Sequence, residues 1–339
     1  MEIFDIDIID AFRDTLKQAK KITIIGHKNV DADSLGSSLA LANFFKKKSV
    51  ITKIIIPDEI PQYFDWLDYK NRVIIYEKEP WEAVNIISES DVIFLLDFSD
   101  LRRIDDLADS VEVSSALKIN IDHHRDHKNI ADFCFVDHNR SSAAELVFEF
   151  MKIIDAKNID KEIAEYIYMG MTSDTGNFAY DSADSRTFGV ASELLEYKID
   201  KSKIINGLYN NHSADRMRLL GHLLDKKMYF IPDKNFAFMV LSLEDQEKYN
   251  YKPGDHENFV NFPLSIADVK FSVLLFEQKD TVKISLRSIG NIDVNKISSK
   301  YFNGGGHKNA SGGRMYSSLQ NAIEFFQNNI DEILVLGKQ

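Results

Sequence analysis

Residues 21–36 read KITIIGHKNVDADSLG, and this segment decides the fold. Its isoleucine-rich beginning predicts a β-strand that ends just before His27. A short polar turn follows, and the spacing of apolar residues over 35–45 then predicts a helix. A strand joined to a helix by a tight polar turn is typical of the βαβ units that build parallel sheets.

The same alternation continues along the first half of the chain. Strand-like and helix-like runs take turns, so we predict an α/β fold with a mostly parallel sheet flanked by helices. The strand-like runs lie at 50–56, 72–76, 91–96 and 117–121, and the helix-like runs at 141–154, 161–171 and 185–197.

The pattern changes after about residue 196, where a polar, helix-compatible stretch begins. Beyond it the sequence predicts a smaller α/β domain with a mixed sheet. Its strand-like runs lie at 235–243, 268–277 and 280–287, and its helical runs at 257–266, 291–300 and 318–333. The predicted domain organisation is 1–195 for the first domain, 196–227 for a linker and 228–339 for the second domain.

Charge is distributed unevenly between these parts. The first 190 residues carry 22 Lys or Arg and 35 Asp or Glu, whereas the remaining residues carry 19 and 18. An acidic first half would repel an anionic substrate unless its carboxylates held cations, which invert the local electrostatics. The broad basic face of a non-specific duplex-binding protein is not visible.

The composition indicates a protein of the cytoplasm. A single cysteine, Cys134, cannot form an internal disulfide, which fits a reducing compartment. The first residues lack the charged and then apolar layout of a signal peptide. The longest apolar runs are of strand length, so we expect no membrane segment.

Acidic and histidine-bearing clusters follow the predicted strands and one helix. Carboxylates and imidazoles are ligands of divalent first-row metals, and strand ends are where open α/β sheets place their chemistry. Taken singly, Asp97 and Asp174 are better explained as cap or turn residues, the cluster at 27–33 is explained equally well as a capping turn, and the cluster at 122–124 favours function. Together they predict a two-metal site, and two metals indicate phosphoryl hydrolysis. The residues are His27, Asp31, Asp33, Asp97, Asp122, His123, His124 and Asp174.

The only strong glycine cluster is a loop in the second half, with Gly304, Gly305, Gly306 and then His307. Glycines allow a backbone to approach a ligand closely, and the N–H groups of such turns bind anions. Arg287, at the end of a predicted strand, could pair with a phosphate in bidentate fashion. A flexible hairpin and a solvated arginine are the alternatives. Arg103 could likewise help to hold a phosphate, or lie on a helix surface.

These motifs, in this order, resemble the DHH phosphoesterase superfamily and its associated DHHA1 domain, most closely the NrnA type of oligoribonuclease and 3′-phosphoadenosine 5′-phosphate (pAp) phosphatase. The resemblance covers roughly residues 20–315. It implies a DHH domain followed by a DHHA1 domain. It departs at Ser311, where many relatives carry alanine.

The resemblance also implies roles for the residues. One Mn²⁺ would be held by His27, Asp31 and Asp97, and a second by Asp33, Asp97, His123 and Asp174. Mg²⁺ or Co²⁺ could replace Mn²⁺. His124 would contact the scissile phosphate and assist the chemistry, with Asp97 and Asp122 as the other catalytic residues. Arg287, His307, Arg103 and the three glycines would bind the substrate.

The function expected from this resemblance is hydrolysis of short single-stranded RNA to 5′-mononucleotides, and of pAp to AMP. Hydroxide activated between two cations would attack phosphorus. Three alternatives stay open, namely hydrolysis of cyclic di-AMP or pApA, hydrolysis of polyphosphate or pyrophosphate, and nucleotide binding without turnover. Partners would be short RNA or phosphorylated nucleotides, with no membrane, and a homodimer stays open.

Overall fold

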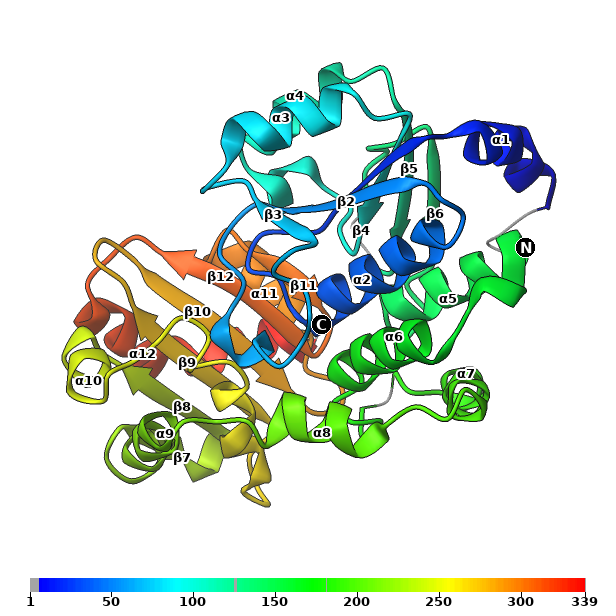
Figure 1. Ribbon diagram of the computed structural model, residues 1–339. Coiled ribbons are helices and arrows are strands. Elements are labelled where there is room, and N and C mark those ends of the chain that lie inside the picture. The colour runs from blue at the N-terminus through cyan, green and yellow to red at the C-terminus, as the bar shows by residue number, and fades with distance from the viewer. Residues whose placement is uncertain (1–5, 125–126, 181, 339) are drawn as a thin grey trace. The chain divides into compact units, whose positions relative to one another are not determined.

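The computed structural model describes residues 6–124, 127–180 and 182–338 (Figure 1). The chain divides into two compact units, and the division falls between Asn211 and His212. Each unit contains one six-stranded sheet. The two units are described separately below.

The sheet of the first unit is fully parallel, as predicted, and its strands follow the order β3-β2-β1-β4-β5-β6. Five of the six strands correspond to runs recognised in the sequence. The sixth, β6, was not predicted, because a run of only four residues is a weak strand signal. The strands are β1 Lys21–Ile25, β2 Ile51–Ile56, β3 Val73–Ile75, β4 Val92–Leu96, β5 Leu117–Asp122 and β6 Phe133–Val136.

Helices cover both faces of this parallel sheet (Figure 1). Residues of α1, α2, α5, α6 and α7 form one apolar cluster with one face of the sheet, and residues of α3 and α4 form another with the opposite face. A strand buried on both faces needs no polar alternation, which explains the uninterrupted apolar run of β4. The helices are α1 Ile6–Gln18, α2 Ala32–Lys46, α3 Pro80–Ser88, α4 Leu107–Val113, α5 Ala143–Asp155, α6 Lys161–Asp174 and α7 Ser185–Glu196.

The segment 196–227, predicted as a linker, contains two helices, α8 (Lys201–Tyr209) and α9 (Ala214–Lys226). Helix α8 contributes Ile204 to the apolar cluster of the first unit. Helix α9 contributes Leu219 and Leu223 to a cluster of the second unit. The domain bounds 1–195 and 228–339 therefore stay a prediction. The division between the two compact units falls inside the predicted linker.

The sheet of the second unit is mixed, in agreement with the prediction, and follows the order β11-β12-β10-β9-β8-β7. Only β8 and β9 pair in parallel. Helix α9 and the 3-10 helix η5 pack on one face, and α11 and α12 on the other. The elements are β7 Met228–Ile231, β8 Phe236–Leu241, α10 Leu243–Lys248, η5 Phe259–Ser265, β9 Phe271–Glu277, β10 Val282–Ser288, α11 Val294–Tyr301, β11 Gly305–His307, β12 Ala310–Met315 and α12 Leu319–Lys338.

The glycine cluster, predicted as a loop, belongs to an antiparallel hairpin of β11 and β12. Gly306 has a φ of 140°, and a Cβ there would lie 2.6 Å from the carbonyl oxygen of Ala310. Glycine is therefore required at this position. Glycine weakens strand propensity, which is why the sequence did not predict these strands.

Burial of His256 in the second unit makes this unit sensitive to acid. The ring stacks on Phe276 at 4.3 Å between centroids, and its Nδ1 lies 2.6 Å from the Tyr251 hydroxyl. Burial lowers the pKa of His256 to about 4, and Glu257 and Lys283 have opposite, smaller effects. The unfolded chain takes up this proton near pH 6.5, so the stability gained by the neutral ring is complete above pH 6.5 and is lost as the pH falls towards 4.

We therefore expect the unfolding free energy of the second unit to fall by roughly 2 kcal/mol from pH 7.5 to pH 5 through His256 alone. Urea unfolding of the intact chain and of His256→Gln at both pH values would measure this contribution. The variant should be less stable at pH 7.5 but show a smaller loss on acidification. Equal losses in the two proteins would contradict the assignment.

Candidate metal centre and substrate-binding residues

The turn after β1 supplies three of the predicted metal ligands. Asp31 is the N-cap of α2, and its Oδ1 accepts hydrogen bonds of 3.0 Å from the N–H groups of Asp33 and Ser34. Its Oδ2 lies 3.8 Å from the Nε2 of His27. The sequence left capping and metal binding as alternatives for this turn, and the geometry allows both, because the two oxygens of one carboxylate face different partners.

His27 is almost fully buried, and both of its ring nitrogens have oxygen neighbours. Its Nδ1 lies 2.8 Å from the carbonyl oxygen of Lys28, and its Nε2 lies 3.2 Å from Oδ2 of Asp97. A backbone acceptor at Nδ1 favours the tautomer with the proton on Nδ1, and this leaves Nε2 as the ligand atom.

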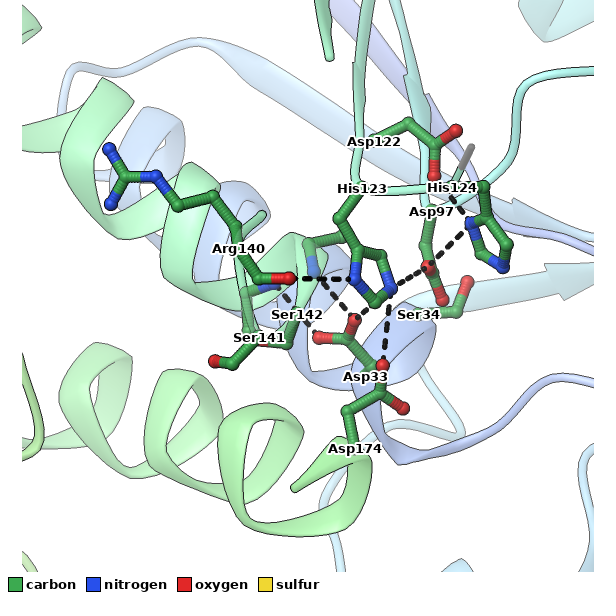
Figure 2. Close-up of polar contacts among 12 residues, drawn as sticks. Asp33, Ser34, Asp97, Asp122, His123, His124, Arg140, Ser141, Ser142 and Asp174 are labelled. Carbon is green, nitrogen blue, oxygen red and sulfur yellow. Dashed lines mark hydrogen bonds and ion pairs between the residues drawn. The ribbon is translucent and has the colours of Figure 1, made fainter. Parts of the chain in front are cut away.

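Asp97, directly after β4, lies at the centre of the site (Figure 2). It is 2% exposed and has a φ of 65°, a conformation that few non-glycine residues adopt. Its Oδ2 faces His27, and its Oδ1 lies 3.5 Å from Nε2 of His123. One carboxylate therefore faces two histidines that come from different strand ends.

Asp33, fully buried at the first turn of α2, faces the N-terminus of α5. Its two carboxylate oxygens accept hydrogen bonds from the N–H groups of Ala143 at 2.7 Å and Ala144 at 2.9 Å. A Cβ on Gly170 of α6 would lie 2.8 Å from Asp33 Oδ1, so glycine is required for this close approach. Helices α2, α5 and α6 thus meet at this carboxylate.

His123, just beyond β5, completes the group that contains Asp33. Its Nε2 lies 3.1 Å from Asp174 Oδ2 and 3.8 Å from Asp33 Oδ2. Its Nδ1 lies 3.3 Å from the carbonyl oxygen of Arg140, as Figure 2 shows. Asp174 was expected just past a helix and is the last residue of α6.

Arg140 and Glu145 were missed by the sequence analysis, and they hold the segment whose carbonyl faces His123. Glu145 is fully buried and accepts hydrogen bonds from the Arg140 guanidinium at 3.0 Å and the Ser141 hydroxyl at 2.7 Å. It also accepts a hydrogen bond of 3.1 Å from the Thr187 hydroxyl. The signal in the sequence was Ser142 with Glu145 three residues later, which is typical of a helix N-terminus.

Asp122 and His124 form a hydrogen-bonded pair beside this centre. Oδ1 of Asp122 lies 2.7 Å from Nδ1 of His124, and Asp122 is fully buried whereas His124 is partly exposed. Nδ1 of His124 also lies 3.8 Å from Oδ1 of Asp97. The pair has the arrangement that orients an imidazole through a buried carboxylate.

The crowded carboxylates perturb each other's pKa values. Burial and the neighbouring charge of Asp97 raise the pKa of Asp31 to about 6 and that of Asp33 well above its usual range. Burial also disfavours the charged form of Asp97, but the neighbouring imidazoles of His123 and His27 outweigh this effect and lower the pKa of the Asp97 carboxyl. Carboxylates packed this closely repel one another unless positive charge lies between them.

The donor set fits divalent cations. In each of two groups, His27 with Asp31 and Asp97, and Asp33 with His123 and Asp174, the ligand atoms lie within 4.8 Å of one another. Within the described residues, the buried Oδ1 of Asp97 accepts no hydrogen bond. A buried carboxylate oxygen of this kind requires an explanation, and a cation provides one. Oxygen and imidazole donors suit Mn²⁺ and related ions.

The substrate-binding residues expected in the second unit share one face of its sheet. Along β10 the apolar residues are buried on the side of α11 and α12, so Lys283, Ser285 and Arg287 point to the opposite side. Arg287 pairs in register with Ala310 of β12, which in turn pairs with His307 of β11. The expected arginine and histidine therefore lie on the same face of the sheet, two strands apart.

Two further basic residues on this face were not predicted. Arg314 of β12 pairs in register with Lys283 of β10, so two like charges are neighbours across the strands. Such a pair is unfavourable unless an anion or acid compensates it, and Glu257 lies 3.9 Å from Lys283. Period-two spacing from Arg287 is the signal that identifies Lys283. Arg103, in the first unit, has an exposed side chain, and its carbonyl accepts a hydrogen bond from Lys28.

Comparisons with known proteins identify the two domains of the chain. The family model for the DHH family, N-terminal domain, matches residues 21–171, and that for the DHHA1 domain matches residues 233–335. The bifunctional oligoribonuclease and PAP phosphatase NrnA of Bacillus subtilis is 26% identical over 304 residues, covering 87% of this chain and 90% of its own.

Solved structures are also similar. The crystal structure of an exopolyphosphatase-related protein from Bacteroides fragilis is 38% identical, with a TM-score of 0.94 and complete coverage of both chains. RecJ from Thermus thermophilus in complex with Mn²⁺ has a TM-score of 0.57 at 14% identity, covering 97% of this chain and 54% of its own. The latter likeness concerns the fold alone.

The fold, the site and these relatives define a phosphoesterase, a hydrolase of phosphoester bonds. The chain belongs to the DHH family, with a DHH domain in its first half and a DHHA1 domain in its second. None of the helices within the described ranges has the length and hydropathy needed to cross a bilayer.

Removing Glu145 should destabilise the first unit strongly. Glu145→Ala leaves the Arg140 guanidinium short of one buried partner, and breaking a buried ion pair costs about 3–5 kcal/mol. Because Glu149 also pairs with Arg140, we expect the lower end, about 3 kcal/mol. Urea unfolding measures the loss. The matched control is Glu193→Ala, whose exposed pair with Lys152 should contribute less than about 1 kcal/mol.

Proposed function

We propose that this chain is a Mn²⁺-dependent phosphodiesterase that releases 5′-mononucleotides from short oligoribonucleotides and converts pAp to AMP. The observation that carries the proposal is the convergence of six imidazole and carboxylate side chains, Asp97 among them, in the DHH domain. The names of curated relatives that match nearly the whole chain support the substrates.

In this proposal His27, Asp31 and Asp97 hold one cation, and Asp33, Asp97, His123 and Asp174 hold the other. Bound divalent cations would supply Lewis-acid charge to the phosphate and a nucleophilic water at neutral pH. Mg²⁺ or Co²⁺ could serve in place of Mn²⁺, since oxygen and imidazole donors accept these ions as well.

The chain's own residues orient the reaction. His124 contacts the scissile phosphate, and the buried Asp122 carboxylate fixes its ring through Nδ1. The carbonyl of Arg140 fixes the His123 ring. Arg103, Arg287 and His307, with the backbone of Gly304, Gly305 and Gly306, bind the phosphates and nucleotide of the substrate.

The basic face of the DHHA1 sheet supports a substrate with more than one phosphate. Arg287, Lys283 and Arg314 present three cationic groups to the same side. A short RNA or a nucleotide with two phosphates places several negative charges at such a surface. A cytoplasmic location, domain bounds at 195 and 228, and a homodimer are further parts of this proposal.

A second candidate is hydrolysis of polyphosphate, favoured by the similarity to the exopolyphosphatase-related protein of Bacteroides fragilis. Cyclic di-AMP or pApA as substrate would use the same metal centre. A binding module without turnover is the alternative of a different class, and the complete donor set counts against it.

A comparison of kcat/KM among pAp, RNAs of two to five nucleotides, cyclic di-AMP and polyphosphate would test the proposal. We expect turnover of the short RNAs and pAp with Mn²⁺, release of 5′-mononucleotides from RNA, and no turnover after chelation of metals. Faster cleavage of polyphosphate would favour the second candidate. Lack of turnover with every divalent metal would favour the binding module.

Two substitutions separate the metal centre from substrate binding. Asp97→Ala should lower kcat at least a thousandfold, because this carboxylate faces both groups of ligands. Arg287→Ala should mainly raise KM, because it removes a binding contact and leaves the cation ligands in place. Steady-state kinetics of both variants on a dinucleotide would show the difference, and similar residual rates would count against it.

A further inference from the structure

We infer that Asn120 is a positioning residue that holds Asp97 in the conformation needed to face both groups of cation ligands. The inference rests on the proposed metal centre. Asn120 is fully buried in the middle of β5, where its neighbours Ile119 and Ile121 are apolar. A buried carboxamide at such a position requires an explanation.

The carboxamide of Asn120 forms hydrogen bonds with the backbone on both sides of Asp97. Its Nδ2 donates one hydrogen bond of 3.0 Å to the carbonyl of Leu95 and another of 2.8 Å to the carbonyl of Phe98. The N–H of Asp97 itself donates to the carbonyl of Ile121 at 3.0 Å. Three hydrogen bonds to β5 thus fix the chain just before, at and just after the aspartate.

Asp97 needs this support because its backbone is strained. Its φ of 65° lies in the left-handed region, and residues held there persist only where the surrounding structure fixes them. A relaxed backbone would turn the carboxylate away from His27 or His123, which lie 3.2 and 3.5 Å from its two oxygens. The strained backbone of Asp97 is therefore what places its carboxylate between the two histidines.

The chemistry of the side chain explains why asparagine stands here. Both partners are carbonyl oxygens, so only a group with two N–H donors satisfies them together, and this fixes the orientation of the amide. Within the described residues, Oδ1 of Asn120 is buried and accepts no hydrogen bond. A buried acceptor without a partner costs free energy, so Asn120 stabilises the structure only through the two hydrogen bonds that its Nδ2 donates.

The test measures Mn²⁺ binding without substrate, by the electron paramagnetic resonance signal of free Mn²⁺. Asn120→Leu keeps the shape of the side chain and removes both donors. We expect its apparent Kd for Mn²⁺ to rise about tenfold to a hundredfold, the range typical when an outer partner of a metal ligand is lost. Asn120→Ser, which is smaller and admits water, should also raise the apparent Kd for Mn²⁺. This second variant provides the test if the leucine variant does not fold.

Thr23→Val is the matched control. Thr23 is also buried in the same sheet, and its hydroxyl forms a 2.6 Å hydrogen bond with Ser90. It should lower the melting temperature as Asn120→Leu does and leave Mn²⁺ affinity unchanged. Wild-type affinity in a folded Asn120 variant, or an equal loss in Thr23→Val, would overturn the inference. A wild-type chain that binds no Mn²⁺ would overturn the metal centre itself and the inference with it.

Discussion

The candidate site depends on one buried carboxylate, that of Asp97, held in a left-handed backbone conformation at the end of β4. Its two oxygens face histidines from two different strand ends. A flexible aspartate could satisfy one of these partners at a time. The surrounding parallel sheet makes both contacts simultaneous, because the neighbouring strand β5 supplies hydrogen bonds to the backbone on either side of it.

The same residues that build the site also build the fold. Asp31 caps α2, Asp33 binds the first N–H groups of α5, and Glu145 joins the start of α5 to α7 through Thr187. Carboxylates at helix N-termini are favoured by the helix dipole, so the chain can bury several of them before any cation binds. The cost is the burial of charged groups together with their mutual repulsion, which raises the pKa values of Asp31 and Asp33, and divalent cations would relieve it.

Much of this could be predicted from the sequence. The strands β1, β4 and β5 are largely apolar runs, and the polar residues at their ends indicated the candidate site, since parallel strands bring their carboxyl ends to one edge. The sequence predicts a loop where the structure has the hairpin of β11 and β12. Glycine has a low strand propensity, so the glycines that allow close backbone packing here also weaken the strand signal. The segment 196–227 is predicted as a helix-compatible linker, and the structure places two helices there, α8 and α9. Ile204 of α8 packs into the apolar cluster of the first unit, and Leu219 and Leu223 of α9 pack into one of the second unit.

Periodicity and residue type were enough to predict the α/β class, the mixed second sheet and the chemical nature of the donor set. The three-dimensional arrangement was needed to show which oxygen faces which histidine, and that Asn120, Arg140 and Glu145 support the candidate site. Asn120 bonds to the backbone beside Asp97, the carbonyl of Arg140 faces the His123 ring, and Glu145 bonds to the Thr187 hydroxyl of another helix. Such bonds depend on how strands and helices pack in three dimensions, and this packing cannot be predicted from a local pattern of residues.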